Sequence, residues 1–368
     1  MVSVRTAAVL LALVLPPATS ARPFPERGAS KAPPIGVQQQ ATAHFAPTGR
    51  VQFFTAPSTG VYNFTAAGAG VGGGHNASVM VPSGRGAVVT GTSALQAGDV
   101  LAILVGSPPP VGSCGGAGGS FVARVGNNST SREPGTLLSS ATPLFVAGGG
   151  GRSSESAVGD ASLTQEGKAG AAPGGAAGGG GSSAAAASDA SSCAGGGFFH
   201  PGAAPAKPPL SGFFDPRFWG ERSLLPCGPG GAFLNGGLGG ASPPDCGTSK
   251  DGGPVDGCPF LPSTSVDSPG GFGGGGGARK KRGGGSGAAA DVQGGCAASG
   301  GGGGGGYSGG GGGGGGGGSF GASPFASAAA TNEGPGYVIA TLLSPGEAAV
   351  AAPAATASGD GAHGVAKV

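Results

Sequence analysis

The first half of the chain contains short apolar segments separated by turn-forming residues. Residues 51–55 and 61–65 are rich in β-branched and aromatic residues and flank the run Pro57-Ser58-Thr59-Gly60, a combination typical of two strands with a short connection. The same composition predicts strands at residues 86–92, 100–105, 121–125 and 144–147. No window has the spacing and end signals of an amphipathic helix. The pattern therefore predicts an all-β fold of short antiparallel strands, most simply a sandwich or jelly roll.

From about residue 148 to residue 318 the sequence is rich in glycine and no longer has the pattern of these strands. The runs at residues 273–277, 300–306 and 309–318 have no side chains to bury, and ordering each residue costs about 1–2 kcal/mol of backbone entropy. Composition alone favours flexible linkers. The alternative is that several glycine strands of the polyproline-II type pack side by side, because without Cβ atoms their backbones can approach closely and exchange hydrogen bonds.

One more predicted strand, at residues 336–343, follows the glycine region and stands alone. It needs a sheet, and the other predicted strands all lie within residues 45–147. We therefore expect the last strand to close against the first ones, with residues 148–335 as a long insertion whose two ends are both attached to the sheet. This arrangement favours packed polyproline-II-type polyglycine helices over a linker and predicts one glycine-rich domain over residues 45–345.

The N-terminal residues predict export. Arg5 precedes the apolar stretch 7–15 and a run of small residues, the pattern of a secretory signal peptide at residues 1–20. The stretch is too short for a membrane anchor, which needs about 18 apolar residues. Residues 21–44 are predicted to be a flexible lead-in rich in Pro, Ala and Gln, and residues 346–368 a disordered tail. We expect a secreted, extracellular protein without a membrane span.

Composition and charge narrow the class of protein. The 368 residues include 88 glycines and 32 prolines, against usual shares of about 7% and 5%. Glycine has no strict three-residue period, which excludes a collagen triple helix. The net charge is +2 with only 10% charged residues, which argues against nucleic-acid binding through phosphate contacts.

Cysteines and glycosylation sequons agree with export. An even number of cysteines suits three disulfides in an oxidising compartment; the candidates are Cys114, Cys193, Cys227, Cys246, Cys258 and Cys296. N-x-Ser/Thr sequons make four asparagines candidates for N-glycosylation, of which the last two overlap: Asn63, Asn76, Asn127 and Asn128.

No residue pattern predicts catalysis, a metal or a cofactor. The cysteines have no C-x-x-C spacing, which argues against zinc and thioredoxin-like redox chemistry. The histidines are scattered and are best interpreted as loop residues without a role: His44, His75, His200 and His363. No nucleophile elbow or catalytic triad signature is present.

A compact basic run is the sharpest local signal; it consists of Arg279, Lys280, Lys281 and Arg282. In an exposed glycine loop of an exported protein, it resembles a furin-type processing site with cleavage after Arg282. The same charges could bind acidic glycans or lipid headgroups. The third interpretation, a solvated loop that interrupts the glycine, carries the greatest weight.

An aromatic run at residues 213–219 contains the only tryptophan, Trp219. Exposed aromatics beside Arg217 would suit a protein-binding hot spot. The favoured interpretation is a small satellite core, because isolated aromatics among prolines usually bury against each other.

Several segments resemble the extracellular glycine-rich domain of the anaplastic lymphoma kinase and leukocyte tyrosine kinase receptors, and they occur in the order found in that family. The match covers about residues 45–345, and its most specific parts are the ILVG and PLFVAGGGGR sequences. The matching segments are Pro57-x-x-Gly60-x-Tyr62, Gly68-Ala69-Gly70, GDVLAILVG at 98–106, GGSFV at 118–122, PLFVAGGGGR at 143–152, Gly270-Gly271-Phe272 and Gly306-Tyr307-Ser308-Gly309-Gly310.

The resemblance implies a jelly-roll-like β-subdomain with a large insertion of packed glycine helices, in a region that takes part in binding a protein ligand outside the cell. It also implies a disulfide between Cys258 and Cys296, which bracket the Gly-Gly-Phe-Gly-rich segment. For the other four cysteines, proximity in the sequence suggests Cys114–Cys193 and Cys227–Cys246.

The chain departs from those receptors in two respects. It has a Pro- and Phe-rich insertion at about residues 198–261, and it has none of the kinase signatures. We therefore expect a non-catalytic extracellular recognition module for a protein or glycan ligand. The alternatives are a structural glycine-rich protein of the cell wall or matrix, and the ectodomain part of a receptor tyrosine kinase whose gene model stops early.

Overall fold

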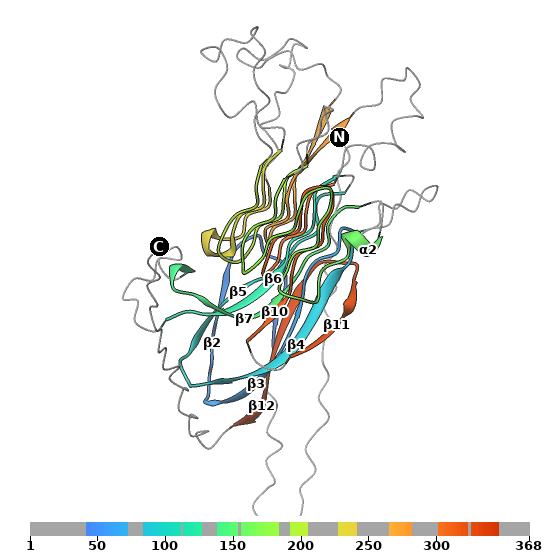
Figure 1. Ribbon diagram of the computed structural model, residues 1–368. Helices are drawn as coiled ribbons and strands as arrows, with labels where there is room; N and C mark the ends of the chain where they lie inside the picture. The colour runs from blue at the N-terminus through green and yellow to red at the C-terminus, as the bar shows by residue number, and fades with distance from the viewer. Residues whose placement is uncertain are drawn as a thin grey trace, which may run out of the picture. The chain divides into compact units, whose positions relative to one another are not determined.

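The computed structural model describes ten segments of the chain. They are residues 42–72, 84–111, 113–126, 138–153, 156–183, 192–204, 227–240, 265–281, 301–322 and 325–345. Within them, ten strands form two five-stranded antiparallel sheets (Figure 1). Helical structure in the same residues is limited to Leu138 and Ser139, α2 (Ser156–Gly159) and the single turn η2 (Phe233–Asn235). The predicted all-β class is thus confirmed for the described chain.

The first sheet, here called the outer sheet, has the order β1-β12-β3-β4-β11. Its strands are β1 (Thr42–Phe45), β12 (Tyr337–Pro345), β3 (Gly60–Ala67), β4 (Gly86–Leu95) and β11 (Phe325–Asn332). Ile339 of β12 pairs with His44 of β1 on one side and with Thr65 of β3 on the other. The last strand therefore closes against the first ones, as the sequence predicted.

The second sheet, here called the middle sheet, has the order β10-β7-β6-β5-β2. Its strands are β10 (Phe320–Gly321), β7 (Thr142–Ala147), β6 (Ser120–Arg124), β5 (Val100–Leu104) and β2 (Gln52–Thr55). A separate two-stranded sheet pairs β8 (Ser265–Ser268) with β9 (Ala278–Lys281).

Five strands were not predicted from the sequence, and they change the predicted boundaries. β1 begins at Thr42, inside the predicted lead-in 21–44, and β8, β9, β10 and β11 lie inside the predicted insertion 148–335. β11 has the sequence FASAAATN, which is poor in residues with high strand propensity. Its strand conformation depends on pairing with β4, a partner more than 200 residues earlier in the chain.

The main hydrophobic core lies between the two sheets. Side chains alternate along β3, so that Tyr62, Phe64 and Ala66 are fully buried while Asn63 and Thr65 point outward and are partly exposed. The β3 aromatics meet β7 across the core, where the Phe64 ring stacks on Phe145 at a centroid distance of 5.7 Å. The core also contains Ala56, Val89, Leu95, Leu101, Ile103, Val105, Val122, Ala147, Val338 and Ala340.

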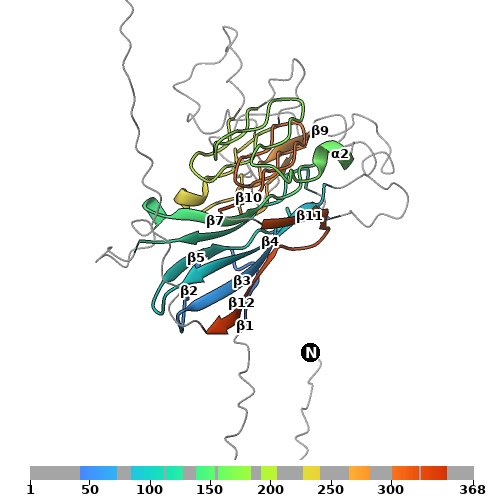
Figure 2. The ribbon, with the colours of Figure 1, turned by 60° about the horizontal axis from the view of Figure 1, so that its bottom comes forward.

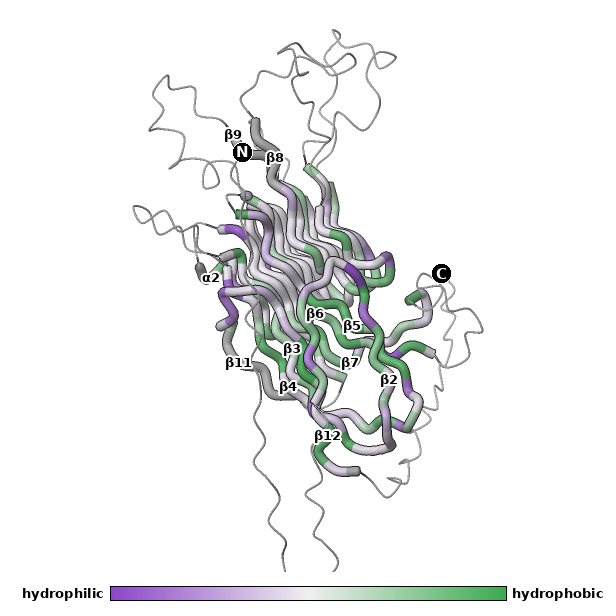
Figure 3. Tube along the Cα trace, turned by 180° about the vertical axis from the view of Figure 1, so that it is seen from behind, coloured by the Kyte–Doolittle hydropathy of each residue, from purple (hydrophilic) through white to green (hydrophobic). Residues whose placement is uncertain are grey.

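The middle sheet is buried on both faces. Its second face contributes Leu104, Phe121 and Val146 to a second cluster, which aromatic residues of the glycine region complete. This explains why β5 and β6 show nearly continuous burial rather than alternation. In Figure 3 the strongly hydrophobic residues are concentrated in the strands, while the glycine segments are nearly white.

Substitution of Phe145 by alanine tests the core between the sheets. The side chain is 1% exposed, so Phe145→Ala is expected to lower the free energy of unfolding by about 3–5 kcal/mol. Phe53→Ala, at a side chain that is 40% exposed on β2, is the matched control and should cause a much smaller loss. Urea unfolding of both variants measures the difference, and equal losses would contradict the assigned core.

Candidate functional site

The glycine segments lie side by side next to β7 and β10 (Figures 1 and 2). Residues 301–307 form the central segment, and almost all of them are buried. These residues are not a flexible linker, the outcome that composition alone favoured, because their amide groups are hydrogen-bonded to neighbouring backbone.

The hydrogen bonds donated by the central segment repeat every three residues. Amides that are three positions apart donate to the same neighbouring segment, and successive amides point to three different segments. The donor–acceptor pairs, at 2.8–3.2 Å, are Gly302 with Cys114, Gly305 with Ala117, Gly303 with Cys193, Gly306 with Gly196, Gly304 with Gly315, and Tyr307 with Gly318. The hydrogen bonds donated by the central segment therefore have a period of three residues.

The carbonyl groups of the central segment accept hydrogen bonds from other neighbours. The donor–acceptor pairs are Gly149 with Gly305, Arg152 with Gly302, Gly276 with Gly303, Gly310 with Gly304, and Gly313 with Gly301. Backbone therefore surrounds the central segment, which satisfies polar groups that would be costly to bury unpaired.

The close approach of these backbones depends on the absence of side chains. A Cβ atom added to Gly304 would lie less than 3.0 Å from the backbone carbonyl of Gly149 and from the carbonyl carbon of Gly150. Both obstacles belong to main-chain carbonyl groups that accept hydrogen bonds, that of Gly149 from Gly317 and that of Gly150 from Ala117, so neither can rotate away. Gly304 is therefore required by packing and not by an unusual backbone angle.

Aromatic side chains join the glycine segments to the middle sheet. Phe121 of β6 stacks on Phe233 at 5.0 Å, and Phe233 stacks on Phe198 at 4.8 Å. Tyr307, at the end of the central segment, stacks on Phe320 of β10 at 4.5 Å. Offset ring pairs of this kind contribute about 0.5–1.5 kcal/mol beyond the burial of their area. They anchor segments that have almost no other side chains.

The same cluster reaches the surface at Phe199, which is 39% exposed and contacts the rings of Phe198 and Tyr307. Another residue of the glycine region, Leu238, is 62% exposed. The sequence analysis missed this surface because the residues come from separate segments. Its only sequence signal is the isolation of the aromatics among glycines.

An ion pair connects β4 to the glycine region. Arg85, directly before β4, donates from its backbone amide and Nε to Oδ1 of Asp160 at 2.8 and 3.2 Å, and from NH2 to Oδ2 at 2.7 Å. Burial raises the pKa of the Asp160 carboxyl, but the hydrogen bonds and positive charge of Arg85 outweigh this, so the net pKa lies below its usual value. The partners are 75 residues apart, and no local motif predicts their contact.

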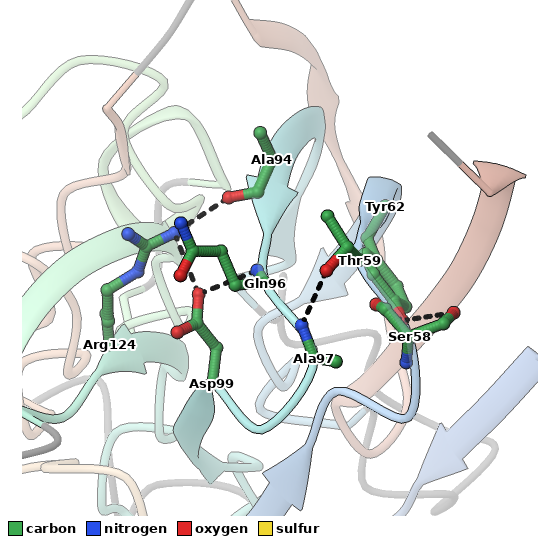
Figure 4. Close-up of polar contacts among 8 residues, drawn as sticks. All are labelled: Ser58, Thr59, Tyr62, Ala94, Gln96, Ala97, Asp99 and Arg124. Atoms are coloured by element: carbon green, nitrogen blue, oxygen red, sulfur yellow. Dashed lines mark hydrogen bonds and ion pairs between the residues drawn. The ribbon is translucent and has the colours of Figure 1, made fainter. Parts of the chain in front are cut away.

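The GDVLAILVG segment begins at a turn that holds β4, β5 and the β2–β3 connection together (Figure 4). Asp99 accepts a hydrogen bond from the Gln96 amide at 3.0 Å and lies 3.8 Å from NH2 of Arg124. The Ala97 amide donates to the Thr59 hydroxyl at 3.0 Å, and Tyr62 donates to the Ser58 carbonyl at 2.8 Å. These contacts are structural and show no catalytic arrangement.

The disulfide pairing predicted from proximity in the sequence is wrong. Cys193 is bonded to Cys227, with Cα atoms 5.8 Å apart, so neither Cys114–Cys193 nor Cys227–Cys246 forms. Hydrogen bonds from Gly202 to Gly230 and from Gly230 to Ala194 align the two bonded segments, a tertiary arrangement that sequence distance does not encode. Cys114 is also disulfide-bonded. The pairing Cys258–Cys296 lies outside the described residues.

The other candidate residues are scattered over the structure or lie outside its described part. Asn63 is on β3, and Arg279, Lys280 and Lys281 are on β9, which pairs with β8. His44 is on β1, and His200 lies in the segment after Phe199. The candidates outside the described residues are Asn76, Asn127, Asn128, Arg282, His75, His363, Cys246, Cys258, Cys296 and the aromatic run 213–219.

In the described segments, no three His, Cys, Asp or Glu side chains are grouped as metal ligands would be. No helix within them is long and apolar enough to cross a membrane. Comparison with protein families and with curated protein sequences finds no match to this chain.

Substitution of Gly304 by alanine tests the backbone packing. Gly304→Ala is expected to destabilise the glycine segments, because overpacking against immobile backbone costs about 1–3 kcal/mol or more. Gly334→Ala is the control, since no atom lies within 4 Å of the added Cβ. Amide hydrogen exchange over residues 301–318 should be slow in the native protein and in Gly334→Ala and faster in Gly304→Ala. Exchange at random-coil rates in the native protein would refute the packing.

The ion pair predicts an acid-sensitive contribution to stability. Because the folded-state pKa of Asp160 lies below the unfolded value of about 3.9, the contribution is present above that value and is lost as the pH falls through the folded-state pKa. Asp160→Asn should lower the unfolding free energy at pH 7 by about 1–3 kcal/mol, a range that allows for the 42% exposure of Arg85.

The Asp160→Asn variant should also lose less stability than the native protein when the pH is lowered from 7 to 3. Glu166→Gln, at an exposed carboxylate of the same segment, is the control and should behave like the native protein. Thermal unfolding at the two pH values measures both effects. Parallel acid profiles for the native protein and Asp160→Asn would refute the contribution of the pair.

Proposed function

We propose that this chain is a non-catalytic, secreted recognition module that binds a protein or glycan partner outside the cell. It resembles the ligand-binding glycine-rich region of the anaplastic lymphoma kinase and leukocyte tyrosine kinase receptors, on the segments given above. In this proposal the two sheets form a jelly-roll-like sandwich, and the glycine segments are packed helices of the polyproline-II type.

The observation that carries the proposal is the three-residue period of the hydrogen bonds around residues 301–307. A polyproline-II helix has three residues per turn and no internal hydrogen bonds, so its amides and carbonyls are available to neighbouring helices. Such a bundle is rigid although its residues have no side chains. A rigid scaffold positions a binding surface before the partner arrives and so reduces the ordering cost of association.

The aromatic surface at Phe199 supports recognition over a purely structural role. Large apolar side chains that remain exposed on an otherwise packed body are typical of interaction sites. Phe199 is also held in place by ring contacts with Phe198 and Tyr307, so little side-chain entropy would be lost on binding. A structural matrix protein would instead associate with copies of itself.

Binding to cells that carry candidate partners tests the proposal. Labelled, disulfide-intact protein should bind saturably and be displaced by unlabelled protein, and Phe199→Ala should weaken this binding at least several-fold. Phe53→Ala, at a side chain of nearly the same exposure on β2, is the control. Self-assembly into insoluble material without saturable binding would contradict the proposal and favour the structural alternative.

A further inference from the structure

The outward face of the outer sheet is lined by side chains that are partly or fully exposed. On β3, Asn63 and Thr65 point outward and are partly exposed, while their neighbours Tyr62 and Phe64 are buried in the core. On β12, Tyr337 belongs to the same outward set and is 37% exposed, and Leu343, where the pairing with β3 is irregular, is 47% exposed. This face is distinct from the aromatic surface at Phe199.

Asn63 occupies the centre of a row of polar residues on this face. The strand register aligns Thr42 of β1, Thr341 of β12, Asn63 of β3 and Thr92 of β4 across four strands. The hydroxyl groups of Thr42 and Thr341 lie 3.4 Å apart. Asn63 itself is not hydrogen-bonded through its side chain in the described part of the chain, so its carboxamide is available for modification.

The face also lacks the charged residues that usually protect an exposed sheet. None of the five strands of the outer sheet contains a Lys, Arg, Asp or Glu. Exposed apolar side chains on a face without charges favour association with other molecules when they form a contiguous patch. A polar group added over this face would cover the exposed Leu343 and Tyr337.

The sequon Asn63-Phe64-Thr65 provides an attachment point for such a group. Because alternate residues of a strand share a face, the acceptor Asn63 and the sequon threonine both point outward, while Phe64 fills the core. An oligosaccharide added to Asn63 before folding would therefore leave the core undisturbed and extend over the outward face. The other three sequons lie outside the described residues.

We propose that Asn63 carries an N-linked oligosaccharide that covers the outward face of the outer sheet. The inference rests on the proposed extracellular function, because the donor, a lipid diphosphate-linked oligosaccharide, is found in the secretory pathway. Nδ2 of Asn63 forms a bond to the anomeric carbon of the sugar, and the bond from that carbon to the diphosphate oxygen breaks. The lipid diphosphate leaves, and a base of the transferring enzyme takes the amide proton. The cover leaves the side of the molecule that carries Phe199 open for a partner.

Peptide mass spectrometry tests the modification. The chain is expressed behind an unrelated secretory leader with Asn76→Gln, so that the tryptic peptide of residues 51–85 contains Asn63 as its only sequon. This peptide should carry an oligosaccharide that a peptide N-glycosidase removes, with an aspartate left in place of Asn63. An unmodified peptide in the exported protein would overturn the proposal.

Two substitutions at one position provide the matched control. Thr65→Ser retains the sequon and the hydroxyl that lies 3.3 Å from that of Thr90, and it should retain the oligosaccharide. Thr65→Ala removes the sequon and should lose the oligosaccharide at Asn63. A modified Asn63 in Thr65→Ala would overturn the assignment. Export of the protein with its own N-terminus is measured in a separate experiment. If that protein stays inside the cell, the result contradicts the proposed extracellular function but not the modification of Asn63.

Oxidative footprinting tests the covering of the face. Removal of the oligosaccharide from the folded protein should increase labelling of Leu343 several-fold and leave Phe53 unchanged. The two side chains have similar exposure in the polypeptide, 47% and 40%, but Phe53 lies on β2 of the middle sheet. Equal labelling of Leu343 before and after removal would show that the sugar does not cover this face.

Discussion

The structure depends on backbone groups of glycine that bond to other backbone groups. In the central segment, amides such as those of Gly302, Gly303 and Gly304 point to three different neighbours, and its carbonyls accept from others. This is possible only where no Cβ separates the chains, as the position of Gly304 against Gly149 illustrates. Glycine pays the largest backbone entropy on folding, so a single such hydrogen bond would not order it. A lattice of them, in which each segment is held from several sides, can do so because ordering one segment completes the bonds of its neighbours.

The sheets supply the hydrophobic burial that this lattice lacks. The core between the sheets contains Phe64 and Phe145, and the second face of the middle sheet carries Phe121 against Phe198 and Phe233. The glycine segments are therefore attached to an ordinary β-protein core through a few aromatic rings. An ion pair adds to this attachment, since Arg85, directly before β4, bonds to Asp160. The disulfide between Cys193 and Cys227 joins two segments of the glycine region to each other. The surface proposed for a partner lies where the aromatic cluster reaches solvent.

The strands were predicted where side chains determine them locally. Residues 100–105 and 144–147 are rich in β-branched and aromatic residues, and they correspond to β5 and β7. β11 was not predicted because its four alanines and one serine have weak strand propensity and adopt a strand only against β4. The pairing of Cys193 with Cys227 was missed for a similar reason, since it depends on which glycine segments are neighbours in space. The aromatic surface combines residues from segments that are far apart in the sequence.

By itself, the sequence determined the all-β class, the positions of most strands and the closure of the last strand onto the first ones. These follow from local side-chain patterns and from the need of a lone strand for a sheet. The sequence also located the glycine runs, but it could not decide whether they are ordered, because glycine has no side-chain pattern that encodes its neighbours. Only the tertiary structure decided that question, the partners of Arg85 and Cys193, and the outward position of Asn63. Each depends on contacts between segments that the chain brings together only when it is folded.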